Sequence, residues 1–168
     1  MDTMLDRIFY SAATWTGLGL AAGLYYREFT RQLDFTGQTQ LSVAHTHALA
    51  LGMLMLLAVL ALAKVFPFEA QAIRLFTWLW NSALALTFGM LVFKGTLQVL
   101  GSPLAESKAI AGVSGLGHML LTGTLVYLFL SLRKAMKAAD AAGAVAHADA
   151  ADAPEVALKS AAPARADA

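Results

Sequence analysis

Cysteine is absent from this chain of 168 residues, and charged residues are scarce, at 14% of the sequence. Without cysteine the protein can form no disulfide, no thiolate metal site and no covalent c-type haem attachment. The formal net charge is only +1, and no basic block indicates a nucleic-acid partner. Apolar residues instead make up 58% of the chain, far more than in a soluble domain. The composition therefore indicates an integral membrane protein whose first partner is the lipid bilayer.

Four apolar segments are long enough to cross a bilayer as α-helices. We expect these spans at about residues 8–27, 41–66, 75–100 and 108–132. The first is interpreted as a retained span and not as a signal peptide, because no clear small-residue cleavage site follows it. The pattern predicts an all-α, integral membrane four-helix bundle over residues 1–137.

The last part of the chain, residues 138–168, is rich in alanine and aspartate and shows no apolar periodicity. We expect it to be disordered. Four spans place both termini on one side of the membrane, and more lysines and arginines flank that side than the other. This bias favours cytoplasmic termini. We expect a multi-pass protein of the bacterial inner membrane.

The triplet His45-Thr46-His47 begins the second span and holds two of the four histidines. Residues two apart differ by about 200° around a helix, so the two rings should face different neighbours. Gly52 returns to the His45 face within about 20° and would let a flat macrocycle lie against bare backbone. A purely structural alternative stays open, in which each histidine bonds a neighbouring helix.

The ionisable residues of the spans share one depth. His118 lies about 15 Å from the start of the fourth span, and His45 and His47 lie about 6 to 9 Å from the start of the second. Lys94 lies about 9 Å from the end of the third span, in the same outer layer of the membrane. Such groups often mark functional sites. For Lys94 the alternative is that its ammonium group reaches the membrane interface.

Neutral imidazoles that face a bundle interior are the usual axial ligands of b-type haem. Lys94, with Arg27 or Arg31 of the outer connection, is suited to neutralise haem propionates. The expected metal ligands are His45, His47 and His118. The sequence thus predicts a protein that binds haem b near the periplasmic face and transfers electrons or binds a small gas such as O2 or NO.

Two alternatives remain open. Imidazole and thioether ligands also suit copper, so a copper-binding membrane protein is the second interpretation. The third is a structural accessory subunit of a respiratory complex, in which polar residues serve only helix association. No catalytic residue is assigned, and whether the chain has a haem-dependent redox activity stays open. A quinone or a respiratory-chain protein would be the redox partner.

Three stretches of the sequence, the first of which includes the His-Thr-His triplet, resemble a known protein family over about residues 5 to 135. They are His-Thr-His followed by Leu51-Gly52-Met53, Lys94-Gly95 with Gln98-Val99-Leu100, and the run Gly112-Val113-Ser114-Gly115-Leu116-Gly117-His118. With these features the chain resembles a family of small four-helix bacterial membrane proteins, catalogued as a domain of unknown function. This resemblance implies the fold and no activity.

The stretch Val43-Ala44-His45-Thr46-His47, followed by Gly52, resembles the His-x-His helix of haem-copper oxidase subunit I. This resemblance implies that His45 ligates an oxygen-binding haem and His47 a low-spin haem. The copper-binding histidines and cross-linked tyrosine of that family have no counterpart here, so oxygen reduction is not expected. That subunit contains three arcs of four helices, which implies a homotrimer with haem held between protomers. A pair formed with His118 inside one protomer is the alternative.

Overall fold

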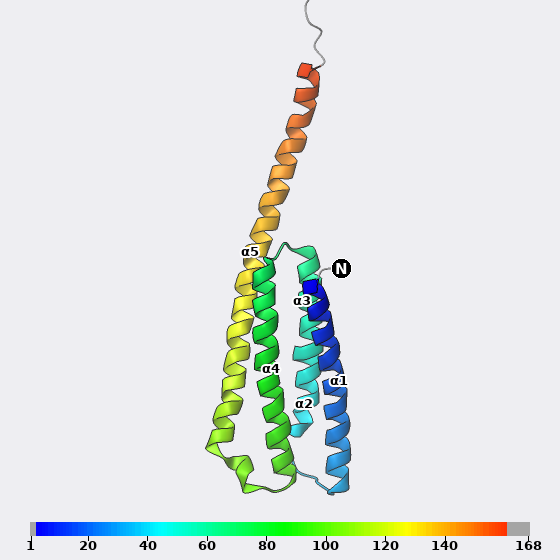
Figure 1. The fold of residues 1–168 in the computed structure, drawn as a ribbon, viewed down its shortest axis with the longest axis vertical. Helices are drawn as coiled ribbons and strands as arrows, with labels where there is room; N and C mark the ends of the chain where they lie inside the picture. Colours follow the sequence, from blue (N-terminus) through cyan, green and yellow to red (C-terminus); the bar gives the residue numbers. More distant parts are fainter. Residues whose placement is uncertain (1–2, 161–168) are drawn as a thin grey trace, which may run out of the picture.

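The computed structural model describes residues 3–160, and the side chains of residues 4–148. All regular structure in this part of the chain is helical (Figure 1). The elements are α1 (Thr3–Gln32), α2 (Leu41–His47), the π-helix η1 (Ala48–Leu54), α3 (Met55–Val65), α4 (Ala70–Val99), the 3-10 helix η2 (Pro103–Glu106) and α5 (Lys108–Ser160). The prediction of an all-α fold is confirmed.

The helices form an up-and-down bundle of four rods, because α2, η1 and α3 run on as a single helix from Leu41 to Val65 (Figure 1). α1 begins at the same end as the α3–α4 connection, which we call the terminal end. The connections from α1 to α2 and from α4 to α5 lie at the other end, which we call the loop end. α5 leaves the bundle at the terminal end, so both ends of the described chain lie on that side.

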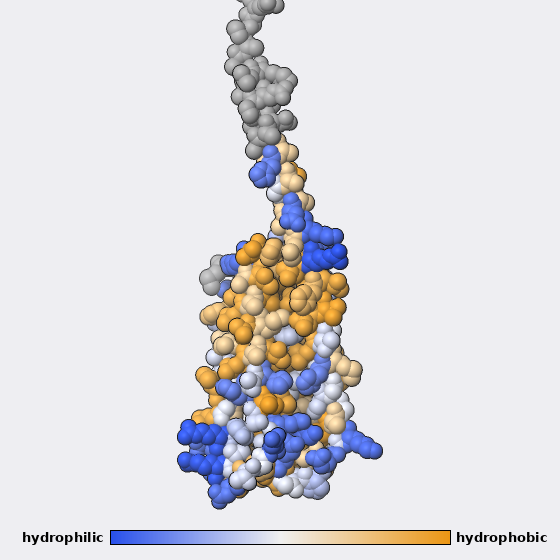
Figure 2. Space-filling view, turned by 180° about the vertical axis from the view of Figure 1, so that it is seen from behind, coloured by the Kyte–Doolittle hydropathy of each residue, from blue (hydrophilic) through white to orange (hydrophobic). Residues whose placement is uncertain are grey.

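Three helical stretches are long and apolar enough to cross a membrane: Leu41–Val65, Ala70–Val99 and Lys108–Ala148. This agrees with a multi-pass membrane protein. α1 has 30 residues but is less apolar than the other three rods, since charged side chains lie in its first and last turns. Figure 2 shows hydrophobic residues over most of the upper half of the bundle surface, whereas hydrophilic patches interrupt the lower half.

The buried core forms a large cluster that extends from the terminal end and a smaller one toward the loop end. Ile8, Phe76 and Leu84 belong to the large cluster and are at most 1% exposed. Toward the loop end the buried cluster contains Ala22 and Ala44. Small residues let helix backbones approach closely, which is how helices associate in a bilayer. Gly95 near the end of α4 likewise leaves no room for a Cβ atom beside the Leu41 backbone, so the start of α2 is held tightly against the end of α4.

The segment after residue 137 differs from expectation. α5 continues without interruption to Ser160, so residues 138–160 are helical where we expected disorder, and residues 161–168 lie outside the described residues. Alanine has the highest helix propensity, and a helix that continues from a packed span pays no nucleation cost. The last buried side chain among those described is Ala135, about 38 Å before Ser160 at 1.5 Å per residue.

Candidate functional site

The π-helix η1 begins directly after His47. Such wide turns are rare and occur frequently at functional sites. Two tryptophans hold this one. Trp80 Nε1 on α4 donates a hydrogen bond to the Leu51 carbonyl oxygen at 2.9 Å, and the side chain of Trp15 on α1 packs directly on Gly52, leaving no room for a Cβ atom there. The backbone after His47 is thus fixed from both sides.

The two histidines of α2 face different helices, as their spacing predicts. Nδ1 of His45 lies 3.0 Å from the Gly19 carbonyl oxygen of α1, and a Cβ atom at Gly23 would lie 3.0 Å from the same nitrogen. The glycines of α1 therefore make room for this ring. His47 instead faces α5, where its ring meets that of His118. His45 serves a helix contact, and His47 belongs to a pair.

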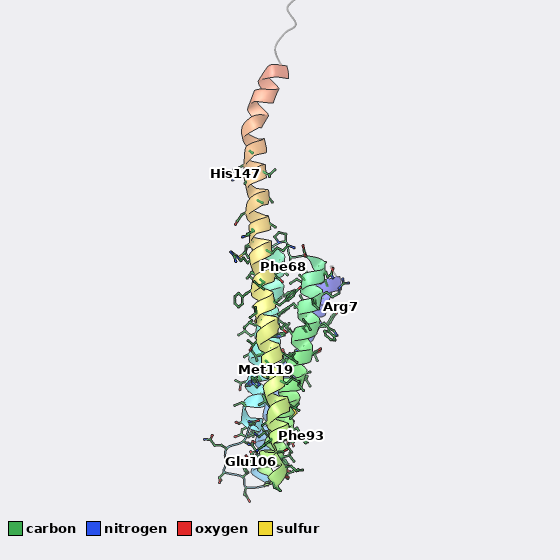
Figure 3. The ribbon with its side chains drawn as sticks, turned by 90° about the vertical axis from the view of Figure 1, so that its left-hand side faces the viewer. Arg7, Phe68, Phe93, Glu106, Met119 and His147 are labelled. Carbon is green, nitrogen blue, oxygen red and sulfur yellow. The ribbon has the colours of Figure 1, made fainter. Side chains whose placement is uncertain are left out.

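The rings of His47 and His118 have their centroids 6.1 Å apart and their planes at 82°. Their helices do not pack against each other within the described chain, because α2 and α5 each pack on α4. The pair therefore lies at the bundle surface beside α4, with His47 half-buried and His118 exposed, and we call the surface between the two rings the histidine groove. In Figure 3, α5 passes in front of α4, and Met119, the neighbour of His118, lies in the lower half of the bundle.

Both rings of the pair are oriented by their own helices. Nδ1 of His47 lies 2.9 Å from the Val43 carbonyl oxygen, and Nδ1 of His118 lies 3.0 Å from that of Ser114. A carbonyl oxygen only accepts hydrogen bonds, so each Nδ1 carries the proton and each Nε2 keeps a lone pair. Histidine ligands of metals are usually fixed in this way.

The separation of the rings suits a shared metal ion. An ion about 2 Å from each Nε2 would put the two centroids about 5 to 6.5 Å apart, depending on the angle at the metal. The observed 6.1 Å lies in this range. Two Nε2 lone pairs cannot hydrogen-bond each other, and a metal ion is one partner that both could share.

The histidine groove also has a cation and free space. Thr87 of α4 contacts Gly117 of α5. Lys94 lies seven residues after Thr87 and therefore on the same face of α4, since residues seven apart differ by only about 20° around a helix. Its side chain is half-buried and has no acidic group within salt-bridge distance among the described side chains. On α5, a Cβ atom at Gly112 or Gly115 would meet nothing within 4 Å. Both glycines are exposed, and Gly115 lies one turn before His118 and about 60° from it around the helix.

Other predicted site residues are not part of the histidine groove. Arg27 and Arg31 lie at the loop end but approach Glu28, at 3.7 and 3.4 Å, with about 70% of each arginine side chain exposed (74% and 72%). Gly52 was expected to lie against a macrocycle. This prediction is wrong, because the side chain of Trp15 fills that space. The angular argument for Gly52 assumed an α-helix, whereas the chain is π-helical there.

The three span histidines do not form one cluster. Among the described residues no group of three or more histidine, cysteine or acidic side chains is arranged to hold a metal ion. The structure brings His47 and His118 together and leaves His45 on α1. Sequence reasoning missed the π-helix and the two tryptophan contacts, because π-helices have no simple residue signature. An indole in a span, which needs a hydrogen-bond acceptor, was the available signal.

Comparison with known proteins gives a family and no activity. No curated protein and no solved structure matches the chain. The resemblance of the His-x-His stretch to haem-copper oxidase, and the homotrimer that it implied, therefore receive no support. One family model matches residues 5–135, which include the whole bundle as far as its last described buried side chain. The chain belongs to this family, whose description is "Protein of unknown function (DUF2871)".

Proposed function

We propose that this protein binds one b-type haem in the histidine groove, with His47 and His118 as its axial ligands, and that it transfers electrons. The single observation that carries the proposal is the histidine pair itself, with ring centroids 6.1 Å apart, both Nδ1 atoms bonded to carbonyl oxygens and a spacing that suits one shared metal. Haem would supply a one-electron redox centre. Two axial imidazoles leave no open coordination position, which favours electron transfer over gas binding.

The surroundings of the pair fit a planar, anionic group. The exposed backbone at Gly115, one turn before His118 and about 60° from it around α5, leaves room for the edge of a macrocycle. Lys94, toward the loop end, is half-buried and is suited to pair with a propionate. The i−4 carbonyl bonds hold both imidazoles in the tautomer that offers Nε2 to a metal.

The proposal also places the protein in a bacterial inner membrane with the loop end outside. The terminal end carries Arg7, Lys64, Arg74, Arg133 and Lys134 on the ends of its helices. Lysine and arginine are enriched on the cytoplasmic side of membrane proteins. A quinone or a respiratory-chain protein on the outer side would then exchange electrons with the haem.

Copper is the second candidate, because two imidazoles without a third ligand also form a site that copper accepts. The separation of the His47 and His118 rings does not distinguish the two metals. The thioether nearest in sequence is that of Met119, which is 67% exposed. A soluble copper ion would not need the open backbone on α5, and for this reason haem is preferred.

The experiment is absorption spectroscopy of the purified protein, expressed with added haem precursor, together with metal analysis. The wild type should show a Soret band and the spectrum of six-coordinate haem. His47→Ala and His118→Ala should each lose this spectrum. His45→Gln is the matched control, since a glutamine amide can still donate to the Gly19 carbonyl oxygen, and it should keep the spectrum.

Three results would change this assignment. Stoichiometric copper without a Soret band would replace haem by copper. Haem that persists in both His47→Ala and His118→Ala would reject the axial pair. A wild type with no metal that co-purifies with other respiratory subunits would favour the role of an accessory subunit.

A further inference from the structure

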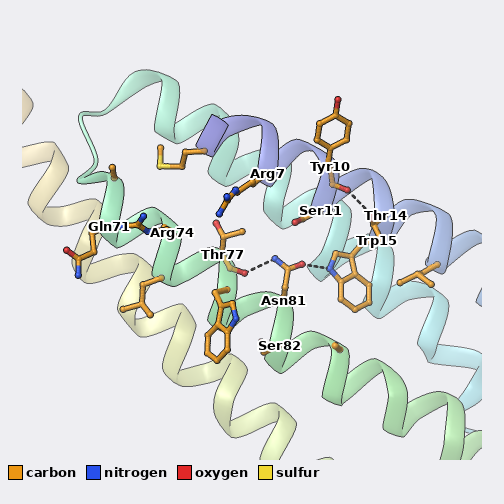
Figure 4. Close-up of a pocket in the computed structure, with 16 residues that line it drawn as sticks. Arg7, Tyr10, Ser11, Thr14, Trp15, Gln71, Arg74, Thr77, Asn81 and Ser82 are labelled. Carbon is orange, nitrogen blue, oxygen red and sulfur yellow. Dashed lines mark hydrogen bonds between the residues drawn. The ribbon is translucent and has the colours of Figure 1, made fainter. Parts of the chain in front are cut away.

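A cleft of about 1270 Å³ opens between α1 and α4 near the terminal end, and it shares no lining residue with the histidine groove. Figure 4 shows its two walls, with Arg7, Tyr10 and Trp15 on α1 and Arg74, Thr77 and Asn81 on α4. Pockets for small ligands usually have about 300 to 1,000 Å³. The cleft is thus large enough for more than a compact solute.

The inner part of the cleft is polar but already hydrogen-bonded. Trp15 Nε1 donates to Asn81 Oδ1 at 2.7 Å, and Asn81 Nδ2 donates to the Thr77 carbonyl oxygen at 2.7 Å. The first bond ties the two walls together at this level, and the second orients the Asn81 amide on its own helix. The polar groups of Trp15 and Asn81 therefore already have hydrogen-bond partners, and no ligand is needed at this level to satisfy them.

The mouth of the cleft carries two positive charges from different helices. Arg7 lies four residues into α1, and Arg74 lies four residues into α4, each about 6 Å from its helix end at the terminal end. Neither guanidinium group is within salt-bridge distance of an acidic group among the described side chains. In a membrane this is the level of the lipid headgroups.

Below the arginines the cleft is bordered by apolar side chains that face outward. Tyr10 and Trp78 are 67% and 66% exposed, and Leu18 and Leu75 are 41% and 43% exposed. Exposed apolar surface on helices of this kind faces lipid tails, and tyrosine and tryptophan collect at the membrane interface. The cleft therefore has a cationic headgroup level and an apolar lower part that is open to the bilayer.

We propose that this cleft binds an anionic phospholipid from the leaflet at the terminal end. Its phosphate would lie between the guanidinium groups of Arg7 and Arg74, which match phosphate oxygens in charge and in bidentate geometry. Its acyl chain would run along Leu18 and Trp78, which line the cleft below the arginines. A free phosphate would make no use of the apolar walls, and a zwitterionic lipid would leave the two arginine charges unbalanced.

The test is lipid binding to the full-length, delipidated protein in detergent, measured by native mass spectrometry with two probes. Dioleoyl phosphatidylglycerol should bind more tightly than dioleoyl phosphatidylcholine. Arg7→Gln and Arg74→Gln should each weaken phosphatidylglycerol binding about fivefold and leave phosphatidylcholine binding unchanged. Arg133→Gln is the matched control, because Arg133 is exposed at the same end on α5 and outside the cleft.

A second pair of variants tests the apolar part without changing charge. Ser82→Phe places a bulky side chain in the cleft and should abolish preferential phosphatidylglycerol binding, whereas Ala21→Phe, exposed on α1 outside the cleft, should not. Circular dichroism and thermal unfolding identify any variant that fails to fold. Equal binding of the two lipids, or an equal loss in Arg133→Gln, would overturn the proposal. So would a dimer that only Ser82→Phe converts to a monomer, since the cleft would then hold a second copy of the chain.

Discussion

Replacing Gly52 by alanine should destabilise the bundle strongly for so small a change. A Cβ atom at Gly52 would collide with Cβ and Cγ of Trp15, which lie close to the α1 backbone and cannot swing away as a side-chain tip can. Overpacking of this kind costs about 1 to 3 kcal/mol. Displacement of the indole also breaks its bond to Asn81, worth about 1 kcal/mol. The expected loss is about 2 to 4 kcal/mol.

The assay is equilibrium unfolding in mixed detergent micelles, followed by circular dichroism. Gly17→Ala is the matched control, because a Cβ atom there would meet nothing within 4 Å. It should be neutral or stabilise the fold by up to about 1 kcal/mol, since alanine favours helix over glycine. Equal stabilities for Gly52→Ala and Gly17→Ala would refute the packing of Trp15 on the π-helix.

Three other outcomes are expected. Trp80→Phe removes the hydrogen bond to the Leu51 carbonyl oxygen, worth about 1 kcal/mol, and also leaves a cavity because Trp80 is buried, so it should cost about 2 to 3 kcal/mol in the same unfolding assay. Gly95→Ala should also cost about 2 kcal/mol or above, because its Cβ atom would meet the backbone of Leu41 and separate α2 from α4. Gly115→Leu should leave stability within about 0.5 kcal/mol but reduce haem binding in the spectroscopic titration, since its side chain enters open space beside the proposed macrocycle.

The helices were predictable because hydropathy reports bilayer-length segments directly. The second rod was expected at 41–66 and is helical over 41–65, ending before Pro67, which cannot continue it. The third was expected from residue 75 but begins at Ala70. Polar helix formers extend a helix beyond its apolar part, and hydropathy does not detect them. α5 extends furthest beyond its apolar segment, for the same reason.

The candidate site was only partly predictable. The opposite directions of His45 and His47 follow from helical spacing alone, and the shared depth of His118 follows from the alternation of the rods. Which histidine meets His118 depends on how α2 and α5 sit on α4, and no local pattern contains that information. Gly52 was misread because a Trp15 contact between distant segments decides its role.

The uninterrupted course of α5 has a mechanical consequence. No proline interrupts the sequence from His118 to Ala148, a stiff shaft about 45 Å long at 1.5 Å per residue. On the bundle side of Ala135 the helix is held along α4, with Leu121, Leu128 and Ala135 buried and Lys134 joined to Glu69 at 2.7 Å. Beyond Ala135 no described side chain is buried, so Ala148 stands about 20 Å away from the last packed residue at 1.5 Å per residue, and the projection acts as a rigid spacer between the bundle and whatever its far end meets.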